Sequence, residues 1–112
     1  MIFAILDKGG FMSLKNEIQE KIEESKADLD LAQETFGGVF ISQDENSTET
    51  IFEVFCEDGE FAFTVCLELS EMKAGTTPQE VYEMIKDCLE EENIDVFDSF
   101  EEWESALEEV YG

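Results

Sequence analysis

Acidic side chains gather near the middle of the chain, where Glu57, Asp58 and Glu60 surround Gly59. Carboxylates can act as general acids and bases, and they can accept the paired hydrogen bonds of an arginine guanidinium. The sequence has no histidine, no glycine-rich phosphate-binding loop and no cysteine pair with metal-ligand spacing. A chain of 112 residues also has little room for a substrate cleft. We therefore expect no enzyme activity, no metal and no cofactor, and we interpret these carboxylates as a binding site for a basic partner.

The surrounding residues, 50–70, have the pattern of a β-hairpin that would hold these carboxylates. Two runs rich in Val, Ile, Phe and Thr flank Asp58-Gly59, a dipeptide typical of a two-residue type I′ turn. Such a turn places Glu57 directly opposite Glu60, where two like charges destabilise the strand pair. Folding alone would not select this acidic turn. The other pairs that the turn predicts, all apolar and all on the inward face, are Cys56–Phe61, Val54–Phe63 and Phe52–Val65.

Net charge is the strongest signal in the composition. Thirty acids against six lysines, with no arginine, give a net charge of −24. Solubility of a small domain needs a net charge of only about 2–8 in magnitude, so the excess indicates a function. It excludes direct nucleic-acid binding and disfavours anionic membranes, because no basic patch is available to meet phosphates. It favours a strongly basic protein as the partner.

The last quarter of the chain is acidic throughout. From Asp87 to Gly112 there are eleven acids and no lysine. Ser99 and Glu102 form a capping-box pattern that opens a helix with outward-facing acids, and the residues expected to face inward are Phe100, Trp103, Leu107 and Val110. A merely solvated helix face usually carries balancing lysines, so we expect a functional acidic surface. The candidate partner-binding residues of the whole chain are Glu57, Asp58, Glu60, Asp98, Glu101, Glu102 and Glu104.

Two further helices and a strand complete the expected fold. A helix over residues 13–35 carries the apolar stripe Leu14, Ile18, Ile22 and Leu29, and its pattern loosens near 28–31, where a break is possible. A short strand is expected over 39–42. The capping box of Thr77 and Glu80 opens a helix that ends near 91–93. We expect one α+β domain over residues 12–112, with an N-terminal helix, a three-stranded antiparallel sheet and two C-terminal helices (αβββαα).

Residues 1–11 permit two interpretations. Ile2–Leu6 can form an edge strand of the sheet. Alternatively, the codons of Lys8 to Gly10 can spell the purine-rich AAAGGAGG, which is what a bacterial ribosome-binding site looks like when it is translated. Natural translation would then begin at Met12, in a bacterial or phage gene, and the first eleven residues would be a non-native extension.

The cysteines bear on the compartment. Cys56, Cys66 and Cys88 are odd in number, and the N-terminal apolar run is too short for a secretory signal. We therefore expect reduced thiols and a location in the cytoplasm of a bacterial host cell.

The order of the expected elements resembles that of the small acidic type II-A anti-CRISPR proteins, which inhibit Cas9. Those proteins share the αβββαα order, turn their central hairpin at an Asp-Gly, and open their last helix with acids followed by an aromatic residue. The matching stretches here are Glu57-Asp58-Gly59-Glu60-Phe61 and Ser99-Phe100-Glu101-Glu102-Trp103. The resemblance covers residues 13–111 as topology.

The resemblance implies a DNA mimic that occupies the basic groove through which Cas9 reads its PAM. Asp58 corresponds to the family's turn Asp, and Glu101 and Glu102 correspond to the acids that open the last helix. Glu60 is a near match, because the family's turn acid falls one residue later. Lys73 and the lysines of the first helix are then expected to lie away from the contact.

Two other functions use the same charge. An antitoxin or immunity protein could block the basic active site of a nuclease toxin, and a toxin gene beside this one would favour that function over the inhibitor. A third possibility is an acidic cytosolic domain whose charge reflects a high-salt cell. The ten phenylalanines and the excess of Glu over Asp, 22 against 8, disfavour the third.

Overall fold

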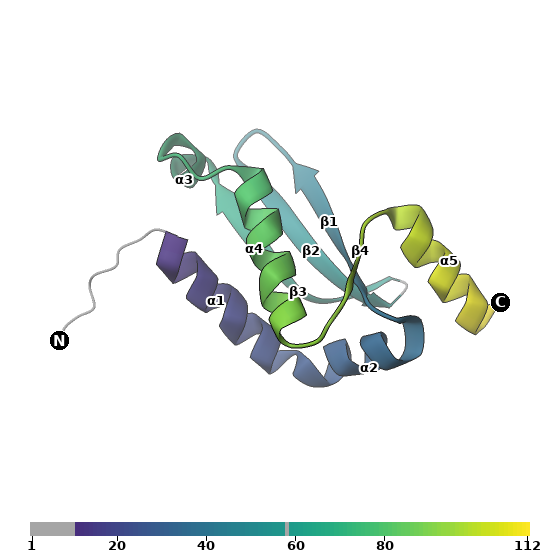
Figure 1. The fold of residues 1–112 in the computed structure, drawn as a ribbon. Helices are drawn as coiled ribbons and strands as arrows, with labels where there is room; N and C mark the ends of the chain where they lie inside the picture. Colours follow the sequence, from purple (N-terminus) through teal and green to yellow (C-terminus); the bar gives the residue numbers. More distant parts are fainter. Residues whose placement is uncertain (1–10, 58) are drawn as a thin grey trace.

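The computed structural model describes residues 11–57 and 59–112, which form an α+β fold (Figure 1). Within these residues it has five helices and one four-stranded sheet. The elements in chain order are α1 (Phe11–Glu24), α2 (Lys26–Phe36), β1 (Val39–Glu45), β2 (Glu49–Glu57), β3 (Glu60–Glu68), α3 (Leu69–Lys73), α4 (Pro78–Glu91), β4 (Val96–Phe97) and α5 (Phe100–Tyr111). The two interpretations of residues 1–11 concern positions outside the described residues, apart from Phe11, which begins α1.

The sheet has the order β3-β2-β1-β4 and is mixed. Strands β1, β2 and β3 are antiparallel neighbours, as the sequence predicts. The expectation of only three strands is wrong, because β4 adds to β1 in parallel, with Val39 opposite Val96. A hydrogen bond of 2.9 Å from the Val39 N–H to the Asp95 carbonyl fixes this addition. A strand of two residues is too short for side-chain alternation to indicate it.

The expected single helix over 13–35 is also wrong, because it is two helices that meet at Ser25. The hydroxyl of Ser25 donates a hydrogen bond of 3.0 Å to the carbonyl of Ala62 on β3. This bond ties the junction to the sheet, and the break therefore lies at Ser25 and not near 28–31. The short helix α3, which the sequence pattern did not indicate, begins with a capping box between Glu68 and Glu71.

The hairpin register is confirmed at two pairs and wrong at the third. Val54 lies opposite Phe63 and Phe52 opposite Val65, as the sequence predicts. Near the turn the register shifts twice, so that Cys56 is not paired with Phe61. Two irregularities of this kind compensate each other, because each strand contributes one extra residue. The pairs that result are Phe55–Phe61 and Glu57–Glu60.

An aromatic cluster accounts for the shifted register. Phe55 and Phe61 meet edge to face with ring centroids 6.0 Å apart, and Phe55 lies 5.8 Å from Trp103 of α5. Trp103 also stacks on Phe40 of β1, with centroids 5.7 Å apart and planes 21° apart. Aromatic pairs of this geometry add about 0.5–1.5 kcal/mol each beyond the burial of their surface. A regular ladder would leave Phe55 without Phe61 beside it.

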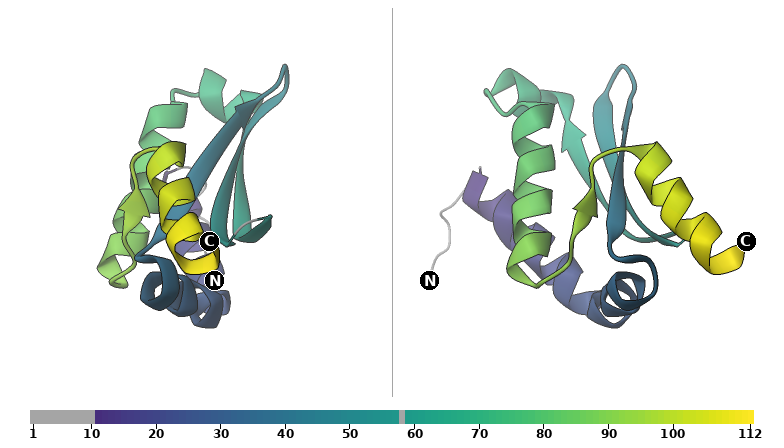
Figure 2. Two further views of the ribbon diagram at one scale, coloured as in Figure 1. Left: turned by 90° about the vertical axis from the view of Figure 1, so that its right-hand side faces the viewer. Right: turned by 45° about the vertical axis from the view of Figure 1, so that its right-hand side comes forward.

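The main core lies between one face of the sheet and the helices α1, α2 and α4. The left view of Figure 2 shows α4 stacked on one side of the strands. The expected apolar stripes are confirmed, since all their members are buried: Leu14, Ile18, Ile22 and Leu29 on the first two helices, and Val81, Met84, Ile85, Cys88 and Leu89 on α4. The capping box of α4 is confirmed too, with Glu80 N–H donating to Thr77 Oγ1 at 3.2 Å and Thr77 N–H to Glu80 Oε1 at 2.9 Å.

Helix α5 packs on the opposite face of the sheet, apart from α1 and α4 (Figures 1 and 2). Side-chain alternation puts Phe40 and Phe55 on that face, and both contact Trp103. Trp103 and Leu107 are buried, as predicted. Phe100 and Val110 were expected to face inward too, but both are exposed, although the Phe100 ring still contacts Phe40 and Trp103. Among the described residues, no helix is long and apolar enough to cross a membrane.

Candidate partner-binding surface

The described lysines all lie on helices, although Lys21 of α1 is near enough to Cys66 of β3 to act on its pKa. In residues 11–57 and 59–112 the five lysines all lie on α1, α2, α3 and α4. The four strands and α5 carry twelve acids and no lysine. The lysines of α1, Lys26 of α2 and Lys73 of α3 are therefore off the strands and α5. We call the acids of the strands and α5 the unbalanced acids.

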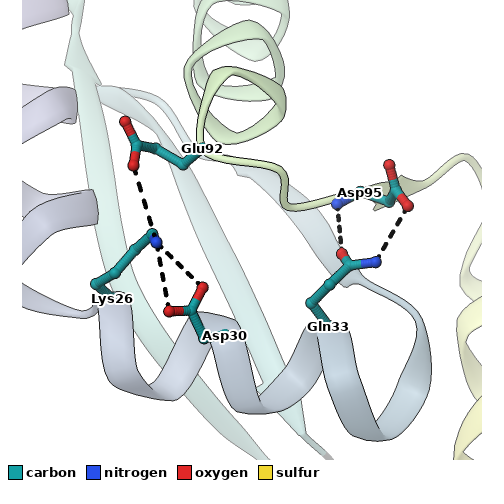
Figure 3. A network of polar contacts seen from close by, with 5 residues as sticks. All are labelled: Lys26, Asp30, Gln33, Glu92 and Asp95. Carbon is teal, nitrogen blue, oxygen red and sulfur yellow. Dashed lines mark hydrogen bonds and ion pairs between the residues drawn. The ribbon is translucent and has the colours of Figure 1, made fainter.

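Lys26 is held in two ion pairs on the helical side. Lys26 Nζ lies 3.2 Å from Asp30 Oδ1 and 3.9 Å from Glu92 Oε1 (Figure 3). Beside them, Gln33 bridges to the loop before β4, since its amide donates to the Asp95 carboxylate at 3.1 Å and its carbonyl accepts from the Asp95 N–H at 2.6 Å. These contacts join α2 to the segment that leads into β4 and α5. They leave the unbalanced acids without a neutralising lysine from α2.

Glu57 and Glu60 lie opposite each other at the end of the hairpin, as the sequence predicts. The hydrogen bond and the negative charge of the Glu60 carboxyl raise the pKa of Glu57 above its usual value, and a hydrogen bond with Tyr111 acts in the opposite direction. Gly59 adopts the positive φ of +81° that a type I′ turn needs. Asp58, the third acid of the predicted site, lies outside the described residues.

The acids that open α5 form a second group. Ser99 caps the helix, because its Oγ accepts a hydrogen bond of 3.2 Å from the Glu102 N–H. Glu101, Glu102 and Glu104 are all exposed in the first turns of α5. Carboxylates in the first turn of a helix interact favourably with the positive end of the helix dipole.

Asp98 differs from the other predicted residues. Its Oδ1 lies 3.5 Å from Lys86 Nζ of α4, and its negative charge raises the pKa of Lys86. The carboxylate is 78% exposed, so the ion pair is well screened by solvent. Asp98 therefore belongs to the boundary between the lysine-bearing helices and the unbalanced acids.

The structure brings in one acid that the sequence analysis did not select. Asp28 of α2 lines the same hollow as Glu57 and Glu60, beside Tyr111 at the end of α5. Asp28 reaches this hollow because the chain turns at Ser25, where α2 begins, and because α5 crosses back over the sheet. Periodicity within one helix cannot indicate such a meeting of three elements. Glu101 and Glu102, in contrast, lie at the other end of α5 from Tyr111, so the predicted residues form two groups and not one.

The thiols are poorly suited to nucleophilic chemistry. Cys66 is exposed, Cys56 is half-buried and Cys88 is buried, and all three are free. Partial burial first, and then neighbouring carboxylates such as Glu49, raise the pKa of Cys66. A raised pKa lowers the thiolate fraction, which is the reactive form. Among the described residues, no group of His, Cys, Asp and Glu side chains is arranged to hold a metal ion.

No protein-family model, no curated protein and no solved structure matches this chain. The class that the structure defines is therefore an acidic α+β protein with a mixed four-stranded sheet.

Proposed function

We propose that this protein is a DNA mimic that inhibits a nucleic-acid-binding enzyme by occupying its basic DNA groove. The target that fits the resemblance is a CRISPR effector nuclease such as Cas9, at the groove that reads the PAM. The observation that carries the proposal is the separation of charge, with twelve acids and no lysine on the strands and α5. In this function the chain acts by occupancy in a bacterial cytoplasm and needs neither a catalytic group nor a cofactor.

The charge and the hydrogen-bonding geometry of carboxylates suit them to imitate the phosphates of DNA. Duplex DNA presents about one negative charge per 1.7 Å of its axis. The sheet and the packed helix fix the backbone positions of these carboxylate-bearing residues, so a partner has to order only their side chains. Arginine donates paired hydrogen bonds to a carboxylate in the same bidentate geometry as to a phosphate. Attraction between opposite charges also speeds the encounter, which suits an inhibitor that must arrive before DNA does.

An antitoxin or immunity protein for a nuclease toxin is the second candidate. The pair Glu57 and Glu60 favours it, because two opposed carboxylates at the end of one hairpin can neutralise a small basic active site. Such a function would need the hairpin end alone. The DNA mimic would need the acids of α5 as well.

Capture from bacterial lysate on the immobilised chain, eluted with a salt gradient, separates these functions. Retention of a large ribonucleoprotein nuclease beyond the salt that removes general basic proteins supports the DNA mimic. A single small nuclease in the late fractions supports the antitoxin instead. A broad mixture of ribosomal and other basic proteins that leaves at low salt would contradict both, because it would show attraction without recognition.

A further inference from the structure

Two hollows lie side by side where α2, the hairpin end and α5 meet. The first, of about 300 Å³, is lined by Asp28 and Leu31 of α2, by the hairpin end, and by Tyr111. The second, of about 320 Å³, runs along α5 from Phe100 to Tyr111. Tyr111 lines both hollows, so they are neighbours, and we call the two together the α5 groove.

The charge lining the α5 groove has one sign. Its acids are Asp28, Glu57, Glu60, Glu104 and Glu108, and none of the five described lysines lines either hollow. The hollow between α1 and α4 is different, because Lys15 lines it together with its acids. The α5 groove is therefore complementary to a cation.

The same groove is bordered by exposed apolar side chains. Six large apolar residues of the described chain are exposed, and four of them line this groove. These four, each between 48% and 63% exposed, are Leu31, Phe61, Phe100 and Tyr111. Single exposed apolar residues are ordinary, but a cluster of them beside a hollow indicates an interaction surface. Mimicry of the phosphate backbone alone would need no such cluster.

Trp103 supplies an independent observation. It lines the part of the groove along α5, is only 3% exposed, and its indole N–H has no acceptor among the described residues. A buried tryptophan N–H normally has a hydrogen-bond partner, since an unmade bond costs stability. Because the N–H is itself buried, a backbone carbonyl of a bound polypeptide would reach it only if the Trp103 side chain shifts toward the groove.

We propose that the α5 groove binds a segment of a basic protein in which an arginine stands beside an apolar side chain. The guanidinium meets the carboxylates of the first hollow, and the apolar side chain lies on the aromatic rings of the second. Arginine fits better than lysine because its planar fork makes paired hydrogen bonds to carboxylates and stacks on aromatic faces. A second copy of this chain is a poor occupant, since both copies carry a charge of −24. The inference rests on the proposed function only in that the partner is basic.

The raised pKa of Glu57 is consistent with a cation bound beside it. Glu60 faces it from β3, Asp28 from α2 and Tyr111 from α5, and the negative neighbours raise the pKa of Glu57. A guanidinium placed between the two glutamates would favour their charged forms and relieve their repulsion. The binding of arginine would therefore release part of a proton at mildly acidic pH.

The test is an NMR titration of the isotope-labelled full chain with two acetylated, amidated tripeptides, Leu-Arg-Leu and Leu-Lys-Leu. We expect the arginine peptide to shift the signals of Asp28, Phe61 and the Trp103 indole N–H, and to bind about threefold to tenfold more tightly than the lysine peptide. The variant E57Q/E60Q should lose that preference. The control E90Q/E91Q on α4 makes the same change in charge and should keep it.

Three results would overturn the inference. One is equal binding of the two peptides, another is a shift pattern scattered over all acids, and the third is equal loss in both variants. Far-UV circular dichroism checks that both variants are folded, which we expect because Glu60, Glu90 and Glu91 are exposed and Glu57 is only half-buried. If the wild-type chain competes with DNA for its nuclease but fails this titration, the inference falls and the proposed function stands. If the chain binds the arginine peptide as expected but does not compete with DNA, the inference about the groove stands and the proposed DNA mimicry falls.

Discussion

Glu57 and Glu60 face each other across the end of the β2–β3 hairpin, and their interaction raises the pKa of Glu57. Like charges opposite each other weaken a strand pair, and a glutamine in either place would avoid this. The hairpin is instead held by its aromatic pair Phe55–Phe61 and by the regular pairs farther from the turn. The acidic pair is therefore a feature that the fold tolerates and that a basic partner would use.

Replacing one of the two glutamates should stabilise the protein. The variant E60Q removes the repulsion and keeps the size of the side chain, so we expect its Tm to rise by a few degrees at pH 7. The control E53Q removes one charge from β2 where the neighbours across the sheet are Ser42 and Thr64. Its Tm should change less. A fall in the Tm of E60Q would show that the acidic pair supports the turn.

The dependence of stability on pH should reveal the same pair. Because the pKa of Glu57 is raised in the folded chain, the folded chain binds this proton more readily than the unfolded chain. The free energy of unfolding should therefore increase as the pH falls through that raised pKa toward the value of the unfolded chain. Urea unfolding at about pH 7 and about pH 5.5 should show a larger gain for wild type than for E60Q, since all other carboxyl groups are common to both. Equal gains would mean that the pair does not share a proton.

Helix α5 should depend on Trp103 far more than on Val110. Trp103 is buried against Phe40 and Phe55, and its replacement by alanine should lower the free energy of unfolding by about 3–5 kcal/mol. Replacing the exposed Val110 with alanine should lower the free energy of unfolding by no more than about 0.5 kcal/mol. Chemical unfolding of both variants measures the difference. Similar losses of stability in the two variants would contradict the packing of α5 on the face of the sheet opposite α1 and α4.

The junction between α1 and α2 should depend on one hydroxyl. The variant S25A removes the hydrogen bond to the Ala62 carbonyl and should cost about 0.5–1.5 kcal/mol. The control S105A changes an exposed serine within α5 and should be neutral or slightly stabilising, because alanine favours helix. If S25A is as stable as wild type, the break between the helices has another cause.

Local patterns in the sequence predicted much of the fold. The Thr77 capping box, the apolar stripes of α1 and α4, and the hairpin with Val54 opposite Phe63 depend on neighbours in the chain, and all are confirmed. The remaining features depend on partners far away. Ser25 breaks the helix by bonding a strand 37 residues later, and β4 is a strand only because β1 lies beside it.

In the candidate site, too, contacts between near neighbours in the chain were predicted and contacts between distant elements were not. The opposition of Glu57 and Glu60 follows from a two-residue turn, so the sequence predicted it. The approach of Asp28 and Tyr111 to that pair requires three elements to be packed together, and no spacing in the sequence indicates it. The hairpin shift that joins Phe55 to Phe61 was missed for the same reason, since its driving contact is Trp103 on a distant helix.

The central claim is that the unbalanced acids replace DNA in a basic groove. The most direct test is the fluorescence anisotropy of a labelled, PAM-containing duplex as it binds Cas9 loaded with its guide RNA, with increasing amounts of this protein added. Two variants with equal loss of charge serve as the comparison: E57Q/E60Q/E101Q/E102Q on the hairpin and α5, and E17Q/E20Q/E23Q/E90Q on α1 and α4. We predict that the wild-type chain blocks duplex binding, that the first variant needs at least about tenfold more protein to do so, and that the second variant behaves like wild type. Duplex binding that is unaffected by the wild-type chain, or an equal loss in both variants, would contradict the claim.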